Sequence, residues 1–267
     1  MTPPPPPTRQ NLSALFTSLA GSRWTLTRTL RSANPADIHG KLTGTATFTP
    51  LVRQDSATSP DGSEAGTGTA TATGTGDGRE MVYKEEGEMP AVPGSGIPPG
   101  LRWSKRYLWR LSSNSTSSSS SSSSSSTSTS TTGDEDGGGG GISVWFVKVA
   151  NDTRSKNSSQ VQEEEAEADY LFHRFEFDFD SDLKPESDSD PTFVSPPPPP
   201  LPSPTANTTT TILTAHGTHL CINDLYRTAY AFRVRPDTGE VVSWASRHVV
   251  KGPRKDQEIV NVYEICG

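Results

Sequence analysis

Residues 23–30 read RWTLTRTL, and this stretch decides the fold. Trp24, Leu26 and Leu30 alternate with threonines, which is the period of two that a half-buried antiparallel strand shows. Nine further segments share this alternation or are rich in Val, Ile, Thr and aromatic residues: 41–48, 80–89, 102–111, 142–149, 169–177, 211–221, 225–234, 240–250 and 257–265. The chain therefore predicts an all-β fold, a single up-and-down antiparallel barrel of about ten strands.

A short helix is predicted before the first strand, over residues 12–21, with Asn11 as its cap and Gly21 at its end. Its apolar residues fall on one face at helical spacing, so we expect it to plug one mouth of the barrel. If the strands run up and down, the connections 31–40, 221–226 and 251–257 then lie at the other end. We place a ligand mouth there, because barrels carry function in the loops at one rim.

Composition limits how much of the 267 residues can pack. The hydrophobic content is 30%, with 23 Gly and 23 Pro, which is low for one packed body of this length. We expect one barrel domain over 11–266, a disordered tail over 1–10, and disordered insertions at 50–79, 112–141, 150–169 and 180–210. Those four tracts hold 18 acidic and 5 basic residues, a net charge of −13 against −7 for the chain, which leaves +6 on the barrel.

Several classes of protein are disfavoured by the sequence. Two cysteines, Cys221 and Cys266, make neither a disulfide framework nor a zinc site. No run approaches the roughly 18 apolar residues of a membrane span, and no broad basic stripe with exposed aromatics points to nucleic acid. We expect a cytoplasmic protein with neither a membrane nor a nucleic acid as its partner. Four arginines precede the first acidic residue, Asp37, so mitochondrial targeting is an alternative to the cytoplasm.

The inward faces carry more polar groups than a plain core tolerates. Burying an unpaired charge is costly, so these groups must pair with one another or meet a ligand. One reading is a structural network in which Arg28 and Lys105 pair with Glu85. The other is a binding site for a compact organic, anionic ligand, whose candidate residues are Arg28, Glu85, Lys105, Trp109, His173, His219, Tyr226, Tyr230, Trp244, His248 and Lys255.

Two other functions remain open. In an enzyme of lipocalin-like shape, a buried His or Glu85 would act as general acid or base, yet no specific catalytic motif occurs and no catalytic residue is assigned. In an interaction scaffold, the prolines of 196–202 would bind a polyproline reader. We expect neither a metal nor a cofactor, since His216, His219 and Cys221 do not have the spacing of a zinc site.

Several motifs resemble an uncharacterised domain-of-unknown-function family, DUF6314, of calycin-like barrels. They are SLAGSRWTLTR, GKLTGTATF, YKEEG, RYLWRL, FHRFEF, HLCINDLYRTAYAF and WASRHVVKGPRKD followed by VYEI. Lipocalin-type barrels commonly begin with Gly, one residue and Trp, whereas two residues separate Gly21 from Trp24 here.

The resemblance implies a barrel of the lipocalin and fatty-acid-binding-protein architecture, without an activity. The shared positions of the family correspond to His219, Cys221, Asp224, Tyr226, Tyr230, Gly252, Pro253 and Lys255. Heme-binding calycins use a histidine near the barrel mouth, but no motif selects His173, His219 or His248 for that role.

Overall fold

The computed structural model describes residues 9–35, 37–51, 78–89, 100–112, 141–148, 166–178, 194–202 and 209–266. These residues form one helix and eleven strands: α1 (Arg9–Ala20), β1 (Trp24–Ser32), β2 (Gly40–Pro50), β3 (Gly78–Glu88), β4 (Arg102–Ser112), β5 (Ile142–Val147), β6 (Ala168–Arg174), β7 (Glu176–Phe177), β8 (Thr211–Cys221), β9 (Asp224–Val234), β10 (Val241–Lys251) and β11 (Asp256–Ile265). The predicted all-β fold is confirmed.

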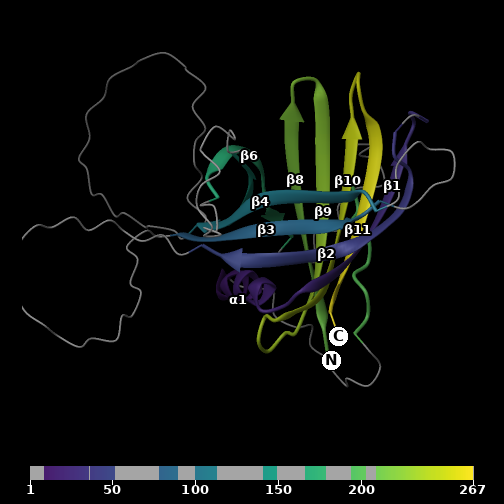
Figure 1. The fold of residues 1–267 in the computed structure, drawn as a ribbon. Coiled ribbons are helices and arrows are strands. Elements are labelled where there is room, and N and C mark those ends of the chain that lie inside the picture. Colours follow the sequence, from purple (N-terminus) through teal and green to yellow (C-terminus); the bar gives the residue numbers. More distant parts are fainter. Residues whose placement is uncertain are drawn as a thin grey trace, which may run out of the picture.

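All strands belong to one antiparallel sheet in the order β6-β5-β4-β3-β2-β1-β11-β10-β9-β8-β7. β6 pairs with β5 and β7 pairs with β8, so the ribbon 168–177 joins the two edges of the sheet and nearly closes a barrel. The predicted sixth strand is thus divided at Phe175, where the chain passes from one edge to the other. In Figure 1, β2 to β4 cross in front of β8 to β11 at a steep angle.

The alternation read from the sequence matches the observed faces on most strands. On β1, Trp24, Leu26 and Arg28 are buried inside, and the threonines between them are exposed or half-buried. The exception is β6, where register shifts interrupt the pairing with β5. This bulge turns Phe172 into the lumen next to His173, whereas strict alternation would place Leu171 on the inner face with His173.

Helix α1 packs under one end of the barrel, as its apolar spacing predicted. Its four large apolar residues are buried in the main core cluster: Leu12, Leu15, Phe16 and Leu19. The indole nitrogen of Trp24 donates to the Leu19 carbonyl over 3.1 Å, which fixes the helix to the start of β1. The helix begins at Arg9, so Asn11 is an interior residue and the predicted cap is wrong. No helix in the described parts of the chain has the length and hydrophobicity to cross a bilayer.

The opposite end, called here the open end, gathers the three connections that the sequence analysis placed together. The turn after β8 contacts the turn after β10, since a Cβ added at Gly252 would lie 2.1 Å from Asp224 Oδ1. Gln257 donates to Asp37 over 2.7 Å, which ties the 33–39 loop to the start of β11. Cys221 at this end and Cys266 at the other are both free thiols.

The proline segment 194–202 lies against the outer wall of the barrel. Arg233 of β9 donates to the carbonyls of Pro199 and Pro200, at 3.1 and 2.9 Å, and Ser243 of β10 donates to Pro200 over 2.6 Å. This part of the predicted 180–210 insertion is therefore bound to the barrel. The tail 1–8 and most of the four predicted insertions lie outside the described residues.

Candidate functional site: a polar and aromatic pocket in the barrel

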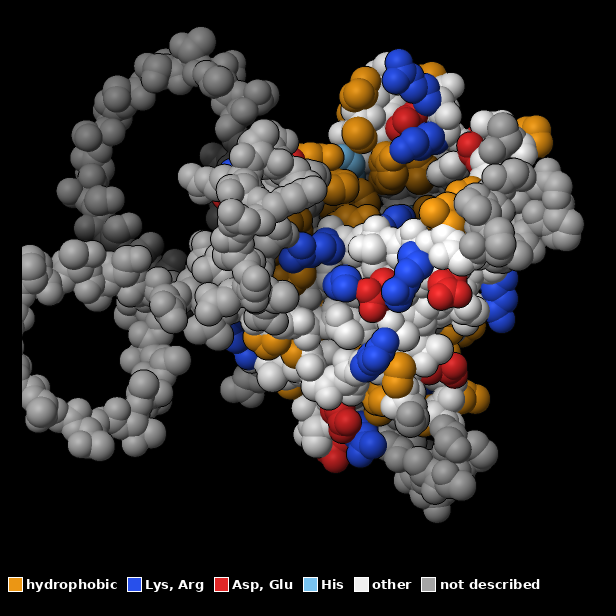
Figure 2. Space-filling view, viewed as in Figure 1, with side chains coloured by type: hydrophobic (Ala, Val, Ile, Leu, Met, Phe, Trp, Pro, Cys, Tyr) orange, Lys and Arg blue, Asp and Glu red, His pale blue; other side chains and the backbone are white. Residues whose placement is uncertain are grey.

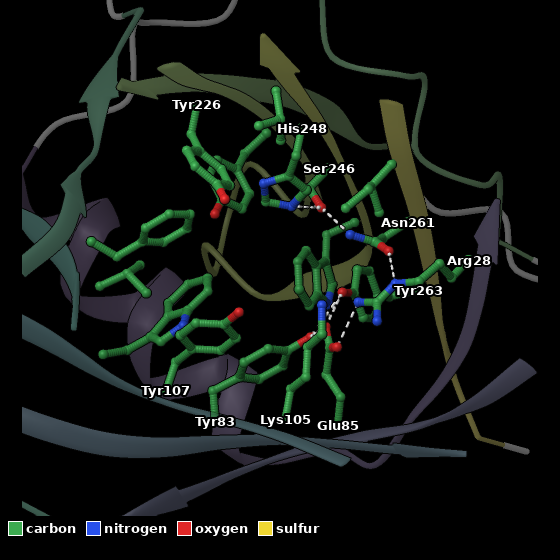
Figure 3. Close-up of a pocket in the computed structure, with 17 residues that line it drawn as sticks. Arg28, Tyr83, Glu85, Lys105, Tyr107, Tyr226, Ser246, His248, Asn261 and Tyr263 are labelled. Carbon is green, nitrogen blue, oxygen red and sulfur yellow. Dashed lines mark hydrogen bonds and ion pairs between the residues drawn. The ribbon is translucent and has the colours of Figure 1, made fainter. Parts of the chain in front are cut away.

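A pocket of about 100 Å³ lies inside the barrel, with α1 behind it in the view of Figure 3. Strands from all sides of the barrel supply its lining: Arg28, Tyr83, Glu85, Lys105, Tyr107, Trp109, Val144, Phe172, Tyr226, Tyr230, Trp244, Ser246, His248, Val250, Ile259, Asn261 and Tyr263. An engineered apolar cavity of about 150 Å³ holds benzene. The enclosed space therefore suits a group of about one ring, and a larger ligand would extend through the mouth.

Stacked aromatic rings make the pocket wall rigid. The rings of Trp244 and Tyr263 are parallel, with centroids 3.5 Å apart. Trp109 meets Trp244 and Tyr230 edge to face, with centroids 6.2 Å away in each case. Such pairs add to the apolar area that the rings bury. Trp24 lies outside the pocket and packs at the α1 end.

A buried ion pair crosses from β1 to β3 within the lining. Arg28 donates to Glu85 Oε2 over 2.5 Å, and Glu85 Oε1 accepts from Tyr83 at 2.5 Å and Tyr263 at 2.9 Å. Burial opposes both charges, yet the attraction of Arg28 keeps the pKa of Glu85 below its usual value, and Glu85 raises the pKa of Arg28. Glu85 is therefore an occupied carboxylate, with a donor on each oxygen.

The same network continues along β11 and β10, as the dashed lines in Figure 3 show. Arg28 Nε donates to Asn261 over 2.7 Å, and Asn261 donates to Ser246 over 2.9 Å. Ser246 bonds His248 Nε2 at 3.1 Å, and Thr228 bonds His248 Nδ1 at 3.0 Å. Burial, followed by the charges of Arg28 and Lys105, lowers the pKa of His248 to about 3, so this ring is neutral at physiological pH.

Lys105 stands apart from this network. Its backbone lies opposite Glu85 in the β3–β4 register, and its side chain lines the pocket beside Glu85 in Figure 3. Within the described residues its ammonium group makes no hydrogen bond or ion pair, whereas Glu85 Oε2 pairs with Arg28. Lys105 is also an exposed residue, so solvent reaches part of its side chain. Desolvation in the pocket, followed by repulsion from Arg28, lowers the pKa of Lys105.

The remaining polar groups of the pocket are mainly donors. The indole nitrogens of Trp109 and Trp244 are buried and have no hydrogen-bond partner among the described residues. Tyr107 keeps its proton, since burial raises its pKa to about 12. Tyr226 accepts a hydrogen bond from Lys255 over 2.8 Å, which leaves its own hydroxyl proton to donate. The two indole nitrogens are covered by other atoms, so the donors that a ligand in this pocket meets are the hydroxyls of Tyr107 and Tyr226.

The structure brings eight of the eleven predicted site residues into the pocket lining: Arg28, Glu85, Lys105, Trp109, Tyr226, Tyr230, Trp244 and His248. His173 lies behind Tyr230, whose hydroxyl bonds His173 Nε2 at 3.0 Å. His219 lies outside the lining, with its ring 6.0 Å from that of Tyr226. Lys255 reaches Tyr226 from the β10–β11 turn.

Nine lining residues were not among the predicted site residues: Tyr83, Tyr107, Val144, Phe172, Ser246, Val250, Ile259, Asn261 and Tyr263. Tyr107 and Ser246 share the inward parity of Trp109 and His248, so strand alternation was the signal that could have identified them. Phe172 enters through the bulge in β6, for which the sequence carries no signal.

The family resemblance is found in the C-terminal part of the chain. Residues 203–265 match the model of a family of unknown function, DUF6314. Comparisons with curated proteins and with solved structures give no match. The matched range spans β8 to β11, which supply Tyr226, Tyr230, Trp244 and His248 to the pocket. Over residues 203–265 this chain therefore resembles a family whose function is unknown, as its motifs led us to expect.

Proposed function

We propose that this protein is a cytosolic barrel of calycin type that binds a compact organic anion, such as a ring-bearing carboxylate, in its lumen. The ammonium of Lys105, which lines the pocket and has no ion-pair partner among the described residues, is the observation that carries the proposal. Arg28 and Glu85 neutralise each other, so Lys105 leaves the pocket with an excess of one positive charge.

An anion would pair with that charge, which both the pocket and solvent reach because Lys105 lines the pocket and is an exposed residue. Charge-assisted hydrogen bonds are about twice as strong as neutral ones. Glu85 is not that partner, because its carboxylate bonds Arg28, Tyr83 and Tyr263 and makes no hydrogen bond to Lys105. A ligand carboxylate placed at Lys105 would supply it.

The neutral groups of the pocket favour the same ligand class. Tyr107 and Tyr226 line the pocket, and each keeps a hydroxyl proton that it can donate. Carboxylate oxygens are acceptors only, so they match this donor set. The aromatic wall would hold the apolar body of the ligand, which the volume of about 100 Å³ limits to roughly one ring.

The geometry supports acid-base catalysis less well. A general base needs a lone pair that can reach the substrate. Both ring nitrogens of His248 bond to Thr228 and Ser246, and both oxygens of Glu85 are occupied. The lowered pKa values of His173, His219 and His248 are all due first to desolvation, which a neutral core histidine also shows.

Tryptophan fluorescence tests the proposal, since Trp109 and Trp244 line the pocket. Purified protein is titrated with benzoate and with its uncharged analogue benzamide. We expect benzoate to bind at least about tenfold more tightly, the effect of one charge-assisted contact of about 1.5 kcal/mol. Lys105→Met should remove that preference.

Lys84→Met is the matched control, because Lys84 is exposed and pairs with Glu86. The control should bind benzoate as the unmodified protein does. Equal binding of benzoate and benzamide, or a benzoate affinity that survives Lys105→Met, would overturn the proposal.

A further inference from the structure

Exposed apolar side chains are concentrated at the open end of the barrel. Eight large apolar side chains are exposed among the described residues, and five lie at this end: Ile38, Leu101, Tyr170, Leu220 and Ile222. The two most exposed of the five, Leu220 at 66% and Ile222 at 82%, belong to the turn between β8 and β9. Figure 2 shows hydrophobic and basic side chains together on the projecting top of the molecule, over the ends of β8 to β11.

Ile222 occupies a backbone conformation that does not suit it. Its φ is 58°, the only positive value of a non-glycine residue in the described chain. A β-branched residue is an outlier there, and glycine is the default choice for such a turn position. The side chain contributes little packing at 82% exposure. Strain of this kind is concentrated at functional positions, and here it points to a role for the exposed side chain.

Basic side chains stand next to this turn. The β10–β11 turn packs against it, with Arg254 N donating to Asp224 Oδ1 over 3.5 Å. Lys251 pairs with Asp256, but Lys255 bonds only the neutral hydroxyl of Tyr226, which raises the pKa of Lys255. Arg254 makes no ion pair with a described residue. The paired turns therefore combine two apolar side chains with two cations that pair with no carboxylate in the described ranges.

We propose that these paired turns, residues 220–224 and 251–255, dock on an anionic lipid surface. Leu220 and Ile222 would enter the headgroup boundary, while Arg254 and Lys255 meet lipid phosphates and carboxylates. The absence of an apolar span in the sequence, which led us to expect no membrane partner, bears only on crossing a bilayer.

The shape of this end favours a lipid surface over a protein. A stable protein interface buries about 800 Å² on each partner and therefore needs a broad complementary face. The two adjoining turn tips present only a few projecting side chains, which do not form such a face. A fluid headgroup layer accepts single inserted side chains without a matching surface.

Sedimentation with vesicles tests this inference. We use the full chain with phosphatidylcholine vesicles, with and without about one third phosphatidylserine, a lipid that attracts basic residues. The protein should bind the phosphatidylserine vesicles, and added salt should weaken the binding. Ile222→Gly should weaken it about tenfold, the effect of withdrawing one large aliphatic side chain from the interface. Arg254→Gln should weaken it about fivefold.

Ile222→Gly also separates docking from a structural role. Glycine relieves the positive φ, so the melting temperature should stay the same or rise, whereas a structural Ile222 would make it fall. Leu201→Ala is the matched control, because Leu201 is 77% exposed and lies in the proline segment on the barrel wall. It should leave vesicle binding unchanged.

Several results would overturn the inference: no binding of the unmodified protein to phosphatidylserine vesicles, full binding by Ile222→Gly, or a lower melting temperature for that variant. A dimer that Ile222→Gly converts to a monomer, without vesicle binding, would assign the turns to a second copy of the chain instead. Benzoate binding does not involve Ile222, so either proposal can fail alone.

Discussion

Lys105 lies directly opposite Glu85 on neighbouring strands, yet the carboxylate of Glu85 pairs with Arg28 at 2.5 Å. The side chains of Arg28 and Glu85 are 6% and 4% exposed, so this pair is effectively removed from water. The choice of partner decides which cation remains without an ion pair among the described residues. Glu85 bonds Arg28 and two tyrosines, and Lys105 is left as that cation.

Removing the charge of Glu85 should destabilise the fold strongly. Glu85→Gln keeps the shape but leaves Arg28 as a buried cation without a counter-charge, a change that costs about 3–5 kcal/mol in other proteins. Urea denaturation measures the difference. Glu258→Gln serves as control, because Glu258 pairs with Arg31 and Arg247 at the surface, and we expect a loss of at most about 1 kcal/mol. Equal losses of unfolding free energy in the two variants would show that the buried ion pair contributes no more to stability than the surface pairs.

Stability should fall in mild acid because the fold keeps two histidines neutral, the half-buried His248 and the buried His173. The pKa of His248 is about 3 in the folded protein and about 6.5 in the unfolded chain. Between these values the unfolded state binds the extra proton, so the free energy of unfolding decreases as the pH falls through this window. The slope is about 1.4 kcal/mol per pH unit for each such histidine. His173, whose pKa burial also lowers, adds in the same direction.

Two variants test whether His248 causes this pH dependence of stability. His248→Gln should reduce the slope of unfolding free energy against pH between about pH 6.5 and 5. His39→Gln is the control variant, because His39 is exposed and lies outside the pocket. Stability that does not vary over this range in the unmodified protein would contradict a neutral His248.

Gly217 makes room for the imidazole of His173. A Cβ at position 217 would lie 2.5 Å from His173 Cδ2 and 2.9 Å from the Arg174 carbonyl. Gly217→Ala should therefore cost about 1–3 kcal/mol through overpacking. In contrast, a Cβ at Gly21 would meet its nearest atom at an ordinary 3.5 Å, so Gly21→Ala should be tolerated. Thermal denaturation compares the two variants. Equal melting temperatures would argue against close packing of the His173 ring on Gly217.

The proline segment should be less available to a polyproline reader than its sequence implies. Arg233 and Ser243 hold the carbonyls of Pro199 and Pro200, which such readers also bind. Arg233→Ala should release them and strengthen binding of a WW domain about tenfold, the effect of losing a bond to a charged donor. Calorimetry measures this affinity. The same affinity for both proteins would mean that the segment is not masked.

Strand alternation predicted much of the fold and most of the pocket. On β1, β10 and β11 the period of two placed Arg28, His248 and Asn261 inside, because a pleated strand leaves each side chain only two faces. The grouping of the three open-end connections followed from the antiparallel order. These features depend on local geometry, which the sequence carries directly.

Features that depend on distant contacts could not be predicted. The bulge that brings Phe172 inward arises where the ribbon 168–177 bridges two sheet edges. The choice of Arg28 over Lys105 as partner of Glu85 depends on the relative positions of three strands. The binding of Pro199 and Pro200 to Arg233 depends on the path of a long connection across the barrel wall, and composition alone predicted disorder there.

The most direct test of the central claim is the pKa of Lys105, measured by NMR of the protein with isotope-labelled lysine, with and without benzoate. The Lys105→Met variant identifies the signal. In the free protein the pKa should lie below the usual value of a lysine, as desolvation and Arg28 require, and benzoate should raise it by placing a negative charge beside the ammonium. A pKa that benzoate leaves unchanged while it occupies the pocket would contradict the account.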